Sequence, residues 1–148
     1  MPTIPDWIAA DAEGGILPPE ALSAPRVRAQ LSPSAVRLFL RIASQWGLTV
    51  SQRRSLLGEI SRSTYQNWRK DRCGVLSPDQ LERISLLLGV HKALKLLFVD
   101  WDGAMRWFRS PNRDIAFAGH SPLDRLLLGG LDDLHAVRRY LDAWRGVK

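Results

Sequence analysis

The stretch from Leu48 to Lys70 constrains the fold most strongly, because it has the pattern of two short helices joined by a tight turn. Thr49 is placed to cap the first helix, and Gly58 stands where a helix ends on a left-handed residue. Ser61 is placed to cap a second helix that runs from Arg62 to Lys70. A helix, a glycine-containing turn and a second helix predict a helix-turn-helix unit, whose second helix enters the major groove of DNA.

The second helix of this unit separates an apolar side from a polar side. Tyr65 and Trp68 lie three residues apart and are expected to face the interior. The outward side then carries groups that can hydrogen-bond to base edges or phosphates, namely Arg62, Ser63, Gln66 and Asn67. Short helices broken by glycine are also ordinary architecture in small helical bundles. The formal net charge of +6 and the pI near 10.2 favour the DNA-binding interpretation.

Length, charge and apolar content limit the classes of protein to which the chain can belong. With 148 residues, the chain is long enough for one domain with a proper core or for two small helical modules. Its basic excess indicates an acidic partner, and charge alone does not choose between nucleic acid and an acidic protein surface. The sequence has neither an apolar stretch near the roughly 20 residues that cross a bilayer nor the start of a secretory signal. We therefore expect a cytoplasmic protein with no membrane partner.

The sequence offers little for catalysis or metal binding. Cys73 is the single cysteine, and the three histidines are scattered without metal-ligand spacing. The adjacent carboxylates Asp132 and Asp133 fall in the first turn of an expected helix, a position that suits the helix dipole rather than catalysis. We find no Ser/His/Asp set and no glycine-rich phosphate loop. We therefore expect a protein that is not an enzyme and that holds no cofactor or metal.

The remaining segments predict further helices around the helix-turn-helix unit. Residues 1–31 carry five of the nine prolines and are expected to form a partly disordered arm. Serine-proline pairs are typical helix starts, because the N–H that proline lacks is not needed in the first turn. Such pairs occur at Ser32-Pro33, Ser77-Pro78 and Ser121-Pro122. The helices that begin at the first two pairs are expected to end at Gly47 and Gly89.

The last helix is expected to run from about Leu131 to Trp144. Its apolar residues recur every three or four positions and form one continuous stripe. Its basic residues Arg138, Arg139 and Arg145 are expected to face outward, either into solvent or against a partner.

The segment from Ala116 to Gly146 combines a Phe-x-Gly element, a Pro-Leu-Asp-x-Leu-Leu helix, a Gly-x-Leu step and a terminal helix ending in Leu-x-x-Trp. In this chain these features are Phe117, Gly119, Pro122-Leu123-Asp124, Leu126-Leu127, Gly130-Leu131 and the segment from Tyr140 to Trp144. With these features the segment strongly resembles the toxin-binding domain shared by the Xre/MbcA/ParS antitoxins. The upstream segment LLGEISRSTYQNW is similar to the Xre-like helix-turn-helix of the same family, so the resemblance covers residues 32–148.

The resemblance implies an all-α protein with two modules after the arm of residues 1–31. Residues 32–98 would form an Xre/Cro-like helix-turn-helix bundle, and residues 99–148 would form a small helical toxin-binding domain. It also implies the antitoxin of a type II module, whose cognate RES-domain toxin consumes NAD and is neutralised by obstruction of its active site. The antitoxin would further repress its own operon by binding double-stranded operator DNA, as a homodimer or within a larger toxin–antitoxin complex.

The resemblance assigns roles to individual residues as well. Arg62, Ser63 and Asn67 would lie nearest the base edges, with Arg62 as the candidate for a bidentate contact to guanine. The DNA-binding set is Thr49, Gln52, Arg62, Ser63, Gln66, Asn67, Arg69 and Lys70. The toxin-binding set is Pro122, Leu123, Arg138, Arg139, Asp142, Trp144, Arg145 and Lys148. Within it, Asp142 could pair with toxin arginines as a phosphate would, whereas the basic residues would need acidic or backbone partners.

One other function explains the charge and the helix-turn-helix pattern equally well. The chain would then be a free-standing dimeric transcriptional repressor with no toxin partner, whose C-terminal helices serve only for dimerisation. Co-purification of an NAD-consuming protein encoded next to this chain would separate the two functions.

Overall fold

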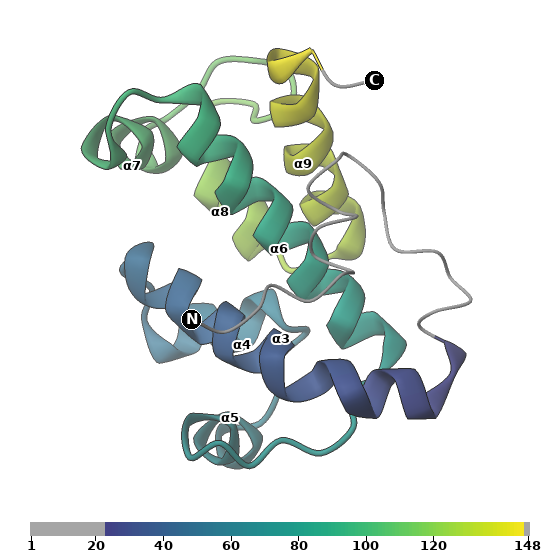
Figure 1. Ribbon diagram of the computed structural model, residues 1–148. Coiled ribbons are helices and arrows are strands. Elements are labelled where there is room, and N and C mark those ends of the chain that lie inside the picture. Colours follow the sequence, from purple (N-terminus) through teal and green to yellow (C-terminus); the bar gives the residue numbers. More distant parts are fainter. Residues whose placement is uncertain (1–22, 147–148) are drawn as a thin grey trace.

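The computed structural model describes residues 23–146, and these residues form seven helices and no strand (Figure 1). The all-α prediction is therefore confirmed. The helices are α3 (Pro25–Gln45), α4 (Val50–Leu56), α5 (Arg62–Arg69), α6 (Pro78–Leu97), α7 (Trp101–Arg109), α8 (Pro122–Leu127) and α9 (Leu131–Arg145). Within the described part of the chain, no helix is long and apolar enough to cross a bilayer.

Helix α6 is the centre of the molecule. It packs against α3 on the side of the helix-turn-helix and against α9 on the side of the C-terminal helices (Figure 1). Its side chains are accordingly buried around most of its circumference, as expected for a helix enclosed by neighbours. Leu81, Ile84, Leu87, Val90 and Leu94 are all at most 1% exposed. Both halves of the molecule therefore share one hydrophobic core.

Three of the predicted helix starts agree with the structure in detail. Ser61 accepts a hydrogen bond from the backbone N–H of Thr64 at 3.1 Å, and Ser77 accepts one from Gln80 at 3.1 Å. Ser121 accepts the corresponding bond from Asp124 at 3.0 Å. Each serine thereby satisfies one of the N–H groups that a helix start leaves without a partner.

The predicted helix start at Ser32-Pro33 is wrong. Helix α3 begins at Pro25 and includes Pro33 in its interior. The Ser32 hydroxyl donates to the Arg28 carbonyl at 2.5 Å and accepts from the backbone N–H of Leu76 at 2.9 Å. Ser32 is buried because it joins α3 to the loop before α6, and it caps no helix. The predicted domain boundary at residue 31 therefore lies within α3, and residues 1–22 of the predicted arm lie outside the described residues.

The predicted helix end at Gly89 is also wrong, because α6 continues to Leu97. Glycine at this position serves packing. A Cβ atom built on Gly89 would lie 2.0 Å from Nη1 of Arg138, so the missing side chain leaves the space that the Arg138 guanidinium fills. Gly47, by contrast, follows the end of α3 with a φ of +67°, as predicted for a helix-ending residue.

Candidate DNA-binding and toxin-binding surfaces

Hydrogen bonds between residues that are close in the sequence stabilise the ends of the helices in the helix-turn-helix. The Thr49 hydroxyl accepts from the N–H of Gln52 at 3.1 Å, and the Gln52 side chain accepts from the N–H of Thr49 at 2.9 Å. At the far end of α4, Gly58 has a φ of +79°, and the N–H of Glu59 reaches back to the carbonyl of Arg54 at 2.9 Å. This is the closing pattern of a left-handed helix end, and it directs the chain through the turn into α5.

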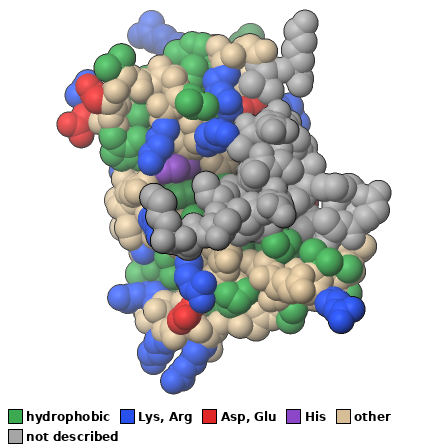
Figure 2. Space-filling model, in the orientation of Figure 1, with side chains coloured by type: hydrophobic (Ala, Val, Ile, Leu, Met, Phe, Trp, Pro, Cys, Tyr) green, Lys and Arg blue, Asp and Glu red, His purple; other side chains and the backbone are tan. Residues whose placement is uncertain are grey.

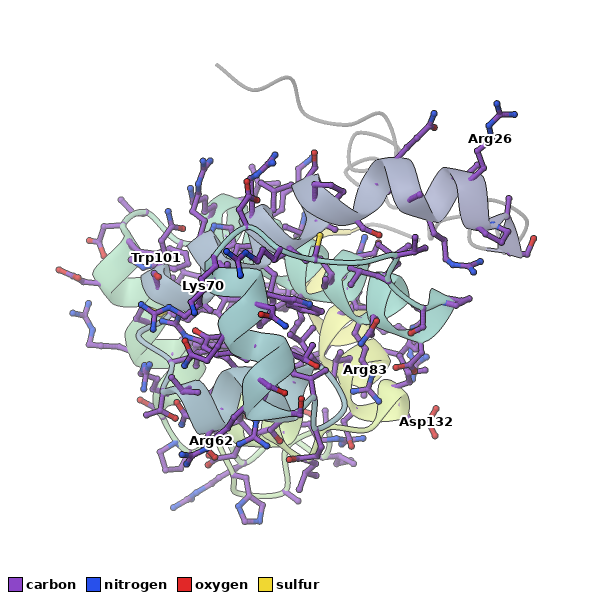
Figure 3. The ribbon with its side chains drawn as sticks, turned by 90° about the horizontal axis from the view of Figure 1, so that it is seen from below. Arg26, Arg62, Lys70, Arg83, Trp101 and Asp132 are labelled. Atoms are coloured by element: carbon purple, nitrogen blue, oxygen red, sulfur yellow. The ribbon has the colours of Figure 1, made fainter. Side chains whose placement is uncertain are left out.

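Helix α5 presents a polar face to solvent. Tyr65 and Trp68 are 1% and 4% exposed, which confirms the expectation that they face the interior. The side chains on the remaining face are exposed, and these are Arg62, Ser63, Gln66, Asn67, Arg69 and Lys70. Figure 3 looks onto α5 from below, with Arg62 near one end of the helix and Lys70 near the other. An outward row of amides, hydroxyls and cations on an accessible helix can reach base edges and phosphates together.

Two arginines of α4 hold α5 in place. Arg53 donates from Nε to the Leu48 carbonyl at 3.0 Å and from Nη1 to the Tyr65 hydroxyl at 3.0 Å. Arg54 donates from Nε to the Ile60 carbonyl at 2.7 Å, which secures the turn between the two helices. Charged donors make the stronger kind of hydrogen bond, so these two side chains fix the angle of α5.

The part of the chain that carries α5 is also its most basic part. Residues 25–89 contain 11 lysines and arginines against 4 aspartates and glutamates, whereas residues 93–146 contain 8 against 7. Figure 2 shows Lys and Arg side chains around the end of the molecule where Figure 1 places α5. A basic surface around an exposed polar helix attracts the phosphates of DNA.

The C-terminal helices place a group of aromatic rings at the other end of the molecule. We call Phe98, Trp107, Phe117, Tyr140 and Trp144 the aromatic cluster; they come from the end of α6, from α7, from the following loop and from α9. The Trp107 ring lies at the centre, with centroid distances of 5.7 Å to Phe98, 5.5 Å to Trp144 and 6.2 Å to Tyr140. Phe117 is buried beneath them, whereas Trp144 is 49% exposed.

Comparison with family models matches two consecutive parts of the chain. Residues 25–89 match the antitoxin Xre-like helix-turn-helix domain, and residues 93–146 match the antitoxin Xre/MbcA/ParS C-terminal toxin-binding domain. The uncharacterised protein y4oB of Sinorhizobium fredii (strain NBRC 101917 / NGR234) is 42% identical over 114 residues, covering 77% of this chain and 86% of that protein. The chain belongs to the Xre/MbcA/ParS antitoxin family. It is an antitoxin with a DNA-binding domain and a toxin-binding domain.

In this antitoxin, some predicted DNA-binding side chains already have intramolecular partners. The Thr49 hydroxyl and the side-chain amide oxygen Oε1 of Gln52 are used in the cap of α4, and the Ser63 hydroxyl lies 3.1 Å from that of Ser61. The hydroxyl hydrogen of Thr49 and the amide nitrogen of Gln52 are the groups left for a phosphate. The role of each predicted residue at DNA stays a prediction.

The predicted toxin-binding residues are divided between the interior and the surface of the antitoxin. Pro122 and Leu123 are the first two residues of α8 and are buried, so their side chains face the interior. Arg139 is exposed, Asp142 and Arg145 are partly buried, and Lys148 lies outside the described residues. Among the predicted residues that the structure describes, Arg139 and Trp144 therefore offer the most side-chain surface to a partner.

Arg138 does not face outward, so that expectation is wrong. Its side chain is 5% exposed, fits against Gly89 of α6 and pairs from Nε with Oδ2 of Asp142 at 3.1 Å. Arg145 lies 3.6 Å from the other carboxylate oxygen of Asp142. Asp142 therefore pairs with two arginines of its own helix, Arg138 and Arg145. The sequence gives a partial signal for this arrangement, because Arg138 and Asp142 are four residues apart on one helix face.

A junction that the sequence does not reveal joins the end of α3 to α6 and α7. The Trp46 indole N–H donates to Nδ1 of His91 at 3.0 Å, and the His91 ring lies 5.0 Å from that of Trp101. Trp101 donates to the carbonyl of Gln45 at 3.2 Å, and Arg109 donates to the carbonyl of Trp46. Burial, and then the ammonium of Lys95, lowers the pKa of His91 to about 4. The toxin-binding half of the antitoxin thus holds the residues just before Thr49.

Proposed function

We propose that this antitoxin neutralises a cognate RES-domain toxin that consumes NAD, by binding it through the C-terminal helices and obstructing its active site. The single observation that supports this dual role is the placement of the two surfaces. Helix α5 lies at one end of the molecule, and the C-terminal ends of α6 and α9, which carry Phe98 and Trp144 of the aromatic cluster, lie at the other end (Figure 1). A protein arranged in this way can hold DNA and a toxin at the same time.

On the DNA side, we propose that α5 enters the major groove of double-stranded operator DNA as part of a homodimer. One α5 helix reads a single half-site, and two copies spaced by a helical turn multiply a modest affinity. Arg62 would contact a guanine, while Lys70 at the other end of α5 would contact phosphate. The cellular site of this function would be the cytoplasm, where the operator is.

On the toxin side, we propose that Arg139 and Trp144 contact the toxin directly. Pro122, Leu123 and Arg138 would act from the interior, by holding α8 and α9 in position. Asp142 pairs with both Arg138 and Arg145, so a contact from Asp142 or Arg145 to the toxin would require these ion pairs to be shared.

Co-purification with the RES-domain protein encoded beside the antitoxin tests the proposal. We expect a stable complex in which NAD consumption by the toxin is abolished, together with a sequence-selective shift of promoter DNA. A protein that shifts promoter DNA as a dimer and leaves NAD consumption unchanged would instead be the free-standing repressor. Loss of both activities in the folded, full-length chain would contradict the proposed function altogether.

A further inference from the structure

We propose that the exposed face of the aromatic cluster, centred on Trp144, is the surface on which the toxin docks. This inference rests on the proposed function and adds to it the position and the chemistry of the contact. The partner surface that fits is an apolar pocket on the toxin bordered by carboxylates.

The outer face of α9 has the pattern of a docking face. Helix α9 buries Leu134, Val137 and Leu141 against the rest of the chain. A second set of positions, also spaced by three and four residues, remains accessible on the same helix: Ala136, Arg139, Tyr140, Ala143 and Trp144. Two alanines among them let another backbone approach closely, while the two aromatic rings supply contact area.

Trp144 is held in place although half of it faces solvent. Its ring centroid lies 5.6 Å from that of Phe98, 5.5 Å from that of Trp107 and 6.5 Å from that of Tyr140. The hydroxyl of Tyr140 in turn donates to Asp114 at 3.2 Å. A large apolar side chain that is already fixed loses little rotamer freedom on binding, so most of its buried area contributes to affinity.

The charges at the edge of the cluster indicate the chemistry of the partner. Arg106 precedes Trp107 on α7, and Arg139 precedes Tyr140 on α9; both side chains are exposed. Neither forms an ion pair with any residue in the described range 23–146. Two unpaired guanidinium groups beside exposed aromatic rings match the composition of interface hot spots, which are rich in Trp, Tyr and Arg. These guanidinium groups complement carboxylates on the toxin surface. With such a contact, no basic side chain of the antitoxin has to enter the toxin's site for the anionic dinucleotide.

A second exposed apolar surface in the same domain is less suited to this role. A groove of about 260 Å³ lies between the loop that carries Ile115 and the end of α8 at Leu128, and these two side chains are 95% and 72% exposed. Among its charged groups, Arg125 pairs with Asp133 at 2.7 Å, and Asp124 accepts from the backbone N–H of Ser121 at 3.3 Å. The two most exposed apolar side chains of this groove, Ile115 and Leu128, are aliphatic, and aliphatic side chains form hot spots less often than Trp, Tyr or Arg.

Titration calorimetry of the full-length antitoxin with the RES-domain toxin encoded beside it tests the inference. We expect Trp144→Ala to weaken toxin binding by about 30-fold or more, and Trp144→Phe to weaken it by less than about fivefold, because an aromatic ring remains. The matched control is Leu128→Ala in the neighbouring groove, which is expected to change toxin binding by less than about threefold. Unchanged binding by Trp144→Ala, with loss of binding by Leu128→Ala, would overturn the inference.

A charge variant covers the case in which Trp144→Ala does not fold, which operator binding would report. Arg139→Glu is expected to weaken toxin binding by about tenfold, and more at low salt than at high salt. Arg26→Glu is its control, since Figure 3 shows Arg26 pointing away from the body of the molecule on α3. Equal toxin binding by Arg139→Glu and the wild type would overturn the inference.

Two further outcomes separate this inference from the proposed function. If the wild-type chain binds no toxin, the proposed function fails, and the inference fails with it. If the wild type binds toxin while Trp144→Ala only converts a dimer to a monomer in light scattering, the occupant of this face is a second copy of the chain. The inference is then overturned while the proposed function stands.

Discussion

At the scale of single residues, the contact between Gly89 and Arg138 sets how closely α6 and α9 approach. In most helix interiors, replacing glycine by alanine stabilises the fold by about 1 kcal/mol. Here the new Cβ would meet Nη1 of Arg138 at 2.0 Å, and the arginine is 4% exposed, with little room to move aside. We expect Gly89→Ala to lower the free energy of unfolding by about 1–3 kcal/mol, measured by urea denaturation.

The matched control for that substitution is Gly74→Ala. No heavy atom lies within 4 Å of a Cβ built on Gly74. Its effect is expected to stay within about 0.5 kcal/mol of the wild type. Equal stability of the two variants would show that the space beside Gly89 does not constrain the packing of α6 against α9.

Arg62 and Lys70 provide a test of roles along α5. Replacing Arg62 by alanine is expected to cost about 1–3 kcal/mol of discrimination at one base pair, because a bidentate contact to guanine is lost. Replacing Lys70 by alanine is expected to weaken all sequences alike and to reduce the slope of log affinity against log salt by about 1. Band-shift titrations on the operator, on point-mutated operators and at several salt concentrations measure both effects. A uniform loss in both variants would contradict the assignment.

At the scale of elements, the junction of α3, α6 and α7 predicts a dependence of stability on pH. The pKa of His91 is lowered to about 4 in the folded chain, whereas an unfolded histidine titrates near about 6.5. Between these values the unfolded state binds a proton that the folded state does not, so stability is complete above about pH 6.5 and falls as the pH is lowered toward 4. The ring is partly exposed, so we expect a loss on the order of 1–2 kcal/mol after solvent screening is allowed for.

Urea denaturation at several pH values between 4 and 7 measures this loss, with His91→Asn as the non-titrating control. The amide oxygen of asparagine can replace Nδ1 as the acceptor for the Trp46 indole N–H. The variant should therefore show a flatter stability curve in this interval. An identical slope in the wild type and the variant would assign the pH dependence to other groups.

The elements also show which features a sequence can predict. The caps at Ser61, Ser77 and Ser121 join residues only three positions apart, so a short pattern determines them. The Ser32-Pro33 pair has the same local pattern, yet Ser32 bonds to Leu76, 44 residues away. The tertiary contact decides the outcome there, and no local pattern contains it.

The candidate surfaces follow the same rule. The exposed face of α5 is a consequence of helical spacing around Tyr65 and Trp68, and the sequence predicted it. The burial of Arg138 depends on a glycine of another helix, and the aromatic cluster depends on three separate helices and a loop. Only the packed chain brings these residues together, so the sequence could place the candidate toxin-binding surface in the C-terminal region but could not identify its residues.

At the scale of the whole molecule, α6 joins two surfaces that lie at opposite ends (Figure 1). Arg83 of α6 illustrates the connection, because it pairs with Asp79 at 2.8 Å and donates to the Gly129 carbonyl in the loop before α9. The Ser55 hydroxyl of α4 also donates to the Leu127 carbonyl of α8 at 3.2 Å. Such links hold the two halves as one body, so that a toxin docked at Trp144, as we propose, would leave α5 free for DNA.

The most direct test of this arrangement is the rate of NAD consumption by the RES-domain toxin, mixed with the antitoxin in the presence of excess operator DNA. The account predicts complete inhibition of the toxin, equal to that measured with excess DNA of scrambled sequence, because the two ligands occupy opposite ends of the antitoxin. Release of active toxin by operator DNA, and not by scrambled DNA, would contradict it.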